Sequence, residues 1–203
     1  MKDLREYYRE LYGDNDITNY RYGQLEDIIA KAKKERPAAL KKADKGGSGW
    51  YISEKMVGIM LYVDKFSRDL YEFEKRIDYL AELGVTYVHF MPLLKSREGN
   101  NDGGYAVADY LSIEEKLGDM KQFERVMGLL KKKGIRTCID FVLNHTAKEH
   151  EWARRCREGD PDYRDMYYMF DDRSIPDQYE KTLTQIFPEV APGNFTYYDD
   201  IKK

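Results

Sequence analysis

Apolar and polar residues alternate with two different periods along the chain after residue 56. Residues 57–63 (VGIMLYV) form a short, nearly all-apolar run, which is typical of a strand that is covered on both faces. Residues 68–83 are predicted to form a helix with one apolar stripe at spacings of three, four and three: Leu70, Phe73, Ile77 and Leu80. Gly84 then predicts a left-handed helix end, and residues 85–90 predict a second strand.

The same alternation returns further along the chain. Asp119 is the expected N-cap of a second helix, with the side chain of Gln122 reaching back as in a capping box. The residues expected to face inward on this helix are Met120, Phe123, Met127 and Leu130. Gly134 ends the helix, and residues 135–142 predict a third strand. Strands that alternate with helices indicate an α/β fold with right-handed βαβ units and a parallel sheet.

The first 49 residues have a different pattern and are expected to form a separate helical segment. A helical spacing joins Leu25, Ile28, Ile29 and Ala32, and Pro37 predicts two short helices or one helix that ends near Arg36. Residues 31–45 are strongly basic, which fits either a solvated helix face or, as an alternative, a nucleic-acid or partner-binding module. The sequence GGSG at residues 46–49 is the candidate boundary.

Composition excludes several classes of protein. The chain has 203 residues, of which 42% are hydrophobic, so it can build a core. Its net charge of −3 provides no chain-wide basic field for nucleic acid or anionic lipid, and no apolar run is long enough for a membrane span. With no apolar signal region at the start, and with only Cys138 and Cys156 as cysteines, a cytoplasmic protein without a disulfide framework is expected.

Candidate chemistry lies in the loops that follow the second and third strands, because ligands of parallel sheets bind beyond the carboxyl ends of the strands. The first loop contains Asp102, two glycines and Tyr105, which can bring backbone close to a ligand and present an aromatic face. An ordinary glycine turn with a packed tyrosine is the alternative.

The second loop brings Asp140, Asn144 and His145 to the end of the third strand. Asp140 lies in an apolar run, where a carboxylate is costly unless a cation or several donors meet it. A buried structural aspartate with a capping asparagine is the simpler alternative. A metal site of His145, Glu149 and His150 is not expected, because the spacing of the two histidines places their rings on different helix faces.

Residues 140–146 (DFVLNHT) resemble the first signature region of the α-amylase superfamily of glycoside hydrolases (family 13). Further segments resemble its amylosucrase branch in particular: residues 91–94, 102–107, 149–153, 167–170 and 192–195. Ala106 follows the loop tyrosine, as in amylosucrases, where most members of the superfamily have aspartate. The resemblance runs from about residue 50 to residue 198, and the helical leader resembles the end of the amylosucrase N-terminal domain.

This resemblance implies that residues 50–203 are the N-terminal part of a (β/α)8 TIM barrel, with about three βα units, reaching the start of the inserted domain B. A complete barrel of this kind takes about 250 residues. Amylosucrases split sucrose through a covalent glucosyl intermediate and pass the glucosyl unit to an α-glucan or to water, without a cofactor. Their nucleophilic aspartate and acid/base glutamate have no counterpart in these 203 residues and are expected beyond residue 203.

The resemblance also implies a role for each candidate residue. Tyr105 would stack on the glucosyl ring, His145 would donate to a glucosyl hydroxyl, and Asp102 would hold an arginine supplied later in a full enzyme. Asp140 would orient the residues next to the nucleophile, and Asn144 would stiffen the loop that carries His145. All five roles are supporting ones.

The hypothesis is therefore the front portion of a retaining α-glucosyltransferase or hydrolase that acts on sucrose and α-glucans. The alternative is an inactive remnant or a weak carbohydrate-binding module. Within the enzyme class, sucrose hydrolase, sucrose phosphorylase, α-glucosidase and trehalose synthase remain as activities, and Ala106 argues against the last two. The expected partners are a small sugar and the remaining part of the barrel, with neither nucleic acid nor membrane.

Overall fold

The computed structural model describes residues 3–45, 49–189 and 192–203, and the chain divides into two compact units, Met1–Glu54 and Lys55–Lys203. Three residues of the glycine-rich joint, 46–48, lie outside the described residues. Within the described part of the chain, no helix combines the length and the apolar character that crossing a bilayer requires.

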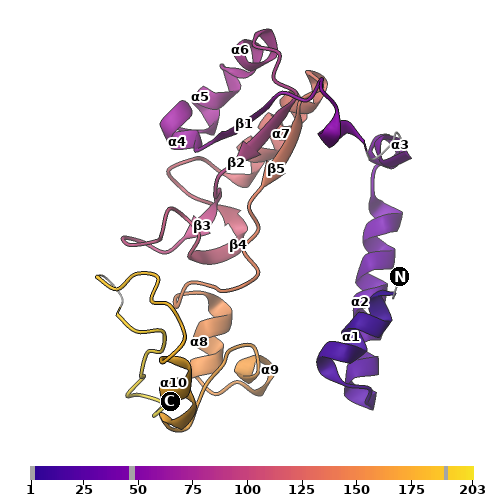
Figure 1. Ribbon diagram of the computed structural model, residues 1–203. Helices are drawn as coiled ribbons and strands as arrows, with labels where there is room; N and C mark the ends of the chain where they lie inside the picture. The colour runs from indigo at the N-terminus through magenta and orange to yellow at the C-terminus, as the bar shows by residue number, and fades with distance from the viewer. Residues whose placement is uncertain (1–2, 46–48, 190–191) are drawn as a thin grey trace. The chain divides into compact units, whose positions relative to one another are not determined.

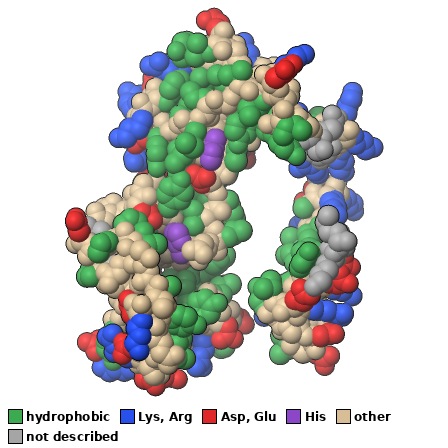
Figure 2. All heavy atoms as spheres, viewed as in Figure 1, with side chains coloured by type: hydrophobic (Ala, Val, Ile, Leu, Met, Phe, Trp, Pro, Cys, Tyr) green, Lys and Arg blue, Asp and Glu red, His purple; other side chains and the backbone are tan. Residues whose placement is uncertain are grey.

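The first unit is helical, with α1 (Leu4–Tyr12), α2 (Asp16–Glu35), α3 (Ala38–Lys45) and the short 3-10 helix η1 (Trp50–Ile52). α2 ends at the residue before Arg36, and α3 begins after Pro37, so the predicted interruption is confirmed. Lys and Arg side chains gather over α3 (Figure 2).

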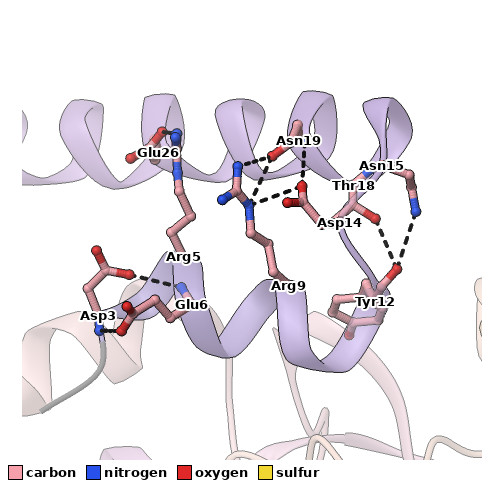
Figure 3. Close-up of polar contacts among 10 residues, drawn as sticks. All are labelled: Asp3, Arg5, Glu6, Arg9, Tyr12, Asp14, Asn15, Thr18, Asn19 and Glu26. Carbon is pink, nitrogen blue, oxygen red and sulfur yellow. Dashed lines mark hydrogen bonds and ion pairs between the residues drawn. The ribbon is translucent and has the colours of Figure 1, made fainter.

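Polar and ring contacts join α1 and α2, and the Tyr8 and Tyr22 rings lie 5.3 Å apart. Arg5 pairs with Glu26 at 2.8 Å, and Arg9 donates to the Asn19 side chain at 2.8 Å (Figure 3). The helical spacing of Leu25, Ile28, Ile29 and Ala32 is confirmed, because all four lie in α2. They do not form a buried face: Ile28 is 65% exposed, and the buried residues of this helix are Thr18 and Tyr22. Exposed ion pairs of this kind each contribute little to stability.

A three-stranded parallel sheet forms the centre of the second unit, in the order β1-β2-β5 (Figure 1). Its strands are β1 (Gly58–Leu61), β2 (Tyr87–Phe90) and β5 (Arg136–Ile139). Met60, His89 and Cys138 are in register across the three strands. The predicted α/β class and the parallel sheet are confirmed, although each strand is shorter than predicted.

Between β1 and β2 the chain forms three short helices, α4 (Val63–Phe66), α5 (Leu70–Glu74) and α6 (Ile77–Glu82). The single helix expected over residues 68–83 is therefore wrong as a continuous element. It is interrupted at Arg76, whose φ of −100° and ψ of 0° are not helical. All four expected apolar side chains are nevertheless buried, and Gly84 has the expected positive φ of 77°.

The helix before β5 is α7 (Met120–Lys132). The Asp119 carboxylate accepts from the Gln122 backbone N–H at 2.7 Å, so the predicted N-cap is confirmed. The Gln122 side chain does not complete a capping box. It donates instead to the Leu70 carbonyl at 3.3 Å and to Glu74 at 3.0 Å. Met120 is 36% exposed, so its expected inward position is also wrong.

An antiparallel pair of strands, β3 (Leu94–Ser96) and β4 (Val107–Ile113), occupies the region expected to be a loop after the second strand. The rest of the unit carries α8 (Glu151–Arg157), α9 (Pro161–Arg164) and α10 (Ser174–Tyr179). The core lies between the sheet and its helices, where the Phe73 and Phe90 rings are 5.1 Å apart.

Candidate functional site

Asp140 joins three segments of the second unit at the carboxyl end of the sheet. Its Oδ1 lies 3.0 Å from His89 Nε2, and its Oδ2 accepts a hydrogen bond from the Tyr105 hydroxyl at 3.1 Å. Its side chain is 22% exposed. β5 ends at Ile139, so Asp140 follows the strand, and the expectation that it lies inside the strand is wrong. The two donors supply the compensation that a partly buried carboxylate needs.

Tyr105 is held by the glycine turn before it. A Cβ on Gly104, whose φ is 97°, would lie 2.9 Å from Pro92 Cβ, and one on Gly103, whose φ is 78°, would lie 2.9 Å from Tyr62 Oη. The positive φ favours glycine at both positions, and at Gly104 the close approach to the rigid Pro92 ring requires it as well. Burial raises the pKa of the Tyr105 phenol, and the hydrogen bond to Asp140 raises it further.

His145 and Asn144 lie on an exposed turn, with Asn144 Nδ2 3.3 Å from His145 Nδ1. The Tyr110 hydroxyl, from β4, donates to the Val142 carbonyl at 2.5 Å and lies 3.4 Å from the His145 carbonyl. β4 thus fixes the backbone of the turn that presents the His145 ring.

The structure brings the predicted residues together in two groups. Tyr105 belongs with Asp140, and Asn144 belongs with His145. Asp102 is exposed on the glycine turn, with a positive φ of 49°.

Sequence reasoning missed His89 and Tyr110. The pattern predicts an apolar strand over residues 85–90, and the histidine between Val88 and Phe90 departs from that pattern. The two-residue period of a strand places this histidine on the face opposite Val88 and Phe90, which is the signal in the sequence that could reveal it.

The residues of the alternative metal site have other partners. His150 is 5% exposed and caps α8, its Nδ1 accepting from the Trp152 backbone N–H at 3.1 Å, and burial lowers its pKa. Glu149 pairs with Arg97 at 3.4 Å. Over residues 3–45, 49–189 and 192–203, no three His, Cys, Asp or Glu side chains are grouped as metal ligands.

The arrangement around Asp140 suits recognition. One carboxylate receives two donors from elements far apart in sequence and thereby fixes an aromatic ring and an imidazole at a strand end. An aromatic ring fixed in this way offers a face on which a ligand can stack.

Residues 37–191 match the family Alpha-amylase, described as the alpha amylase catalytic domain. The chain is 32% identical over 148 residues to a 4-alpha-glucanotransferase of Thermotoga neapolitana, covering 69% of this chain and 33% of the relative. It is 40% identical over 93 residues to an oligo-1,6-glucosidase of Parageobacillus thermoglucosidasius, covering 45% of this chain and 16% of the relative. The chain thus spans a third or less of the length of these relatives.

Solved structures show the same relationship. The trehalulose synthase MutB from Pseudomonas mesoacidophila MX-45 superimposes with a TM-score of 0.55 at 30% identity, covering 63% of this chain and 24% of that chain. A MutB variant in complex with the substrate sucrose gives a TM-score of 0.52 at 31% identity, covering 60% and 23%. The three-stranded parallel sheet and its helices accordingly represent part of a TIM barrel. The chain belongs to the α-amylase family of glycoside hydrolases, and most of it is a portion of the catalytic domain of that family.

Proposed function

We propose that this chain supplies part of the glucosyl-binding pocket of a retaining enzyme that transfers or hydrolyses α-glucosyl units of sucrose and α-glucans. The observation that carries the proposal is the Tyr105 ring, anchored through its hydroxyl on Asp140 at the carboxyl end of the parallel sheet. A tyrosine fixed in this way can stack on the apolar face of a sugar ring. Its π-face also favours the positive charge that develops at the anomeric carbon.

The remaining candidate residues take supporting roles in this proposal. His145 donates to a glucosyl hydroxyl, and Asn144, beside its ring, limits the motion of that donor. Asp102 holds an arginine outside these 203 residues. Asp140 orients the residues next to the nucleophile, and the nucleophilic aspartate and the acid/base glutamate lie beyond residue 203.

Within the family we favour an amylosucrase-like activity, on the motifs that include Ala106. The relatives include a glucanotransferase, a glucosidase and a trehalulose synthase, the last of which is also known in complex with sucrose. Relatedness thus supports an α-glucosyl substrate and leaves transfer, hydrolysis and isomerisation to be separated by experiment.

The experiment titrates the purified 203-residue chain with glucose and with sucrose, and follows the binding by NMR. We expect weak saturable binding that Tyr105→Ala reduces by about tenfold, which corresponds to about 1.4 kcal/mol. Tyr79→Ala is the matched control, because Tyr79 is a half-exposed tyrosine on α6 and should leave the affinity unchanged. Equal affinities in the wild type and in Tyr105→Ala would contradict the proposal.

A second measurement concerns catalysis. Because the proposal places both catalytic carboxylates outside these residues, the purified chain should release no fructose from sucrose above a blank. Robust release would show that the chain carries its own nucleophile and would overturn that part of the proposal.

A further inference from the structure

We propose that His89 is a positioning residue that sets the orientation of the Tyr105 ring through the Asp140 carboxylate. The inference rests on the proposed function, because the orientation of the Tyr105 ring matters only if that ring stacks on a sugar. It concerns a residue of the central strand that does not itself need to touch the sugar.

The sheet determines where His89 lies. β2 is paired on both sides, with Met60 of β1 and Cys138 of β5 in register with His89. Val88 and Phe90 are fully buried in the core, so the alternation of the strand places His89 on the opposite face. The backbone of a strand that is hydrogen-bonded along both edges moves little. The Cα of His89 is therefore held in place, and its side chain can hold the Asp140 carboxylate in one orientation.

The two oxygens of the Asp140 carboxylate link His89 to Tyr105. His89 Nε2 is 3.0 Å from Oδ1, and the Tyr105 hydroxyl is 3.1 Å from Oδ2, so each oxygen has one of the two partners. A carboxylate held at one oxygen alone can turn about its Cβ–Cγ bond. The donor at Oδ1 therefore stops that rotation and keeps Oδ2 directed at the phenol.

The surroundings of His89 are consistent with a donor role. Its side chain is 27% exposed and that of Asp140 is 22% exposed, so water competes only partly for this hydrogen bond. With Nε2 protonated, neutral imidazole donates to Oδ1. The contact uses Nε2, the ring atom that the amide nitrogen of glutamine reproduces best, and His89→Gln is therefore the conservative replacement.

The test compares His89→Leu, which removes the donor, with His89→Gln, which keeps one, in the full 203-residue chain. The readout is the titration of the Tyr105 phenol, followed by NMR in protein labelled at the tyrosine Cζ and assigned with Tyr105→Phe. In the wild type and in His89→Gln the pKa of this phenol should lie above the ordinary tyrosine value. In His89→Leu it should fall toward that value as Asp140 turns away, and the affinity for glucose should fall about three- to tenfold.

The outcomes separate the two proposals. An unchanged Tyr105 titration in His89→Leu would overturn the inference, and so would an equal change in His89→Leu and His89→Gln. If His89→Leu does not fold, His89→Ala serves in its place, because it also removes the donor at Oδ1 and should lower the pKa of the phenol in the same way. If the titration responds as expected while Tyr105→Ala still binds glucose normally, the positioning by His89 stands and the glucosyl-binding proposal fails.

Discussion

Glu74, on α5, accepts hydrogen bonds from two residues of α7. Arg125 donates to both of its oxygens at 2.7 Å, and the Gln122 amide donates at 3.0 Å. The hydrogen bonds from Arg125 and then Gln122 lower the pKa of Glu74 from 4.5 to about 2. Because the pKa is lower in the folded state, this carboxylate stabilises the fold above pH 4.5, and its contribution is lost as the pH falls toward 2.

We therefore predict that Glu74→Gln lowers the melting temperature at pH 7, and that its difference from the wild type narrows between pH 4.5 and pH 2. Circular dichroism melts across this range would measure it. Glu124→Gln, at an exposed position of α7, is the charge-matched control and should change the melting temperature little. Parallel curves for the wild type and Glu74→Gln would argue against a role for this ionisation.

Some residues of the candidate site could be predicted from the sequence, and others could not. Asp140 and Tyr105 could be found because each stands beside glycines or at the end of an apolar run. The His89–Asp140 contact could not, because it depends on the pairing of Tyr87 with Arg136, and that register brings together residues 51 positions apart. Tyr110 was missed for a similar reason, since its role depends on a strand that was not predicted.

At the scale of elements, the turn between β3 and β4 provides a matched pair of glycines. Gly99 and Gly104 have φ values of 73° and 97°, so alanine at either position is strained. A Cβ on Gly99 meets no atom within 4 Å, whereas one on Gly104 would lie 2.9 Å from Cβ of the rigid Pro92 ring.

Gly99→Ala should therefore cost about 1 kcal/mol of the free energy of unfolding. Gly104→Ala should cost more, by about 1–3 kcal/mol, because it adds overpacking. Urea unfolding measures the cost in both variants. Glucose binding should weaken in Gly104→Ala alone, because Gly104 directly precedes Tyr105 in the chain. Equal costs in the two variants would mean that Pro92 moves aside freely.

The hydrophobic pattern predicts some of the secondary-structure elements correctly and misses others. The three parallel strands and the burial of Leu70, Phe73, Ile77 and Leu80 followed from spacing alone. The break at Arg76 did not, because a 3.6-residue stripe continues across two short helices that face the same core. β3 and β4 were missed because a three-residue strand and a glycine-rich turn give little alternation to detect.

At the scale of the whole molecule, the second unit leaves backbone edges and apolar side chains open. Among the residues that the structure describes, β1 and β5 each pair on one side only. Met60, on β1, is 64% exposed, and further exposed apolar residues are Leu111, Phe141 and Leu143. Unpaired strand edges beside apolar surface favour association with other chains.

We predict that the purified chain self-associates as its concentration rises, and that Met60→Lys weakens this association by placing a charge on the β1 edge. Sedimentation velocity over a concentration series would measure both. Leu83→Lys, at a similarly exposed leucine at the end of α6, should leave the association unchanged. A monomer that persists at high concentration would contradict the prediction.

The alternation along β2 separates the residues that pack in the core from those on the face that contacts Asp140. Val88 and Phe90 point into the core, while Tyr87 and His89 occupy the other face of the same four-residue strand. Substitutions at Tyr87 and His89 therefore leave the core contacts of Val88 and Phe90 in place. The face that carries the contact with Asp140 can thereby vary in sequence while the packing of the strand against its helices is retained.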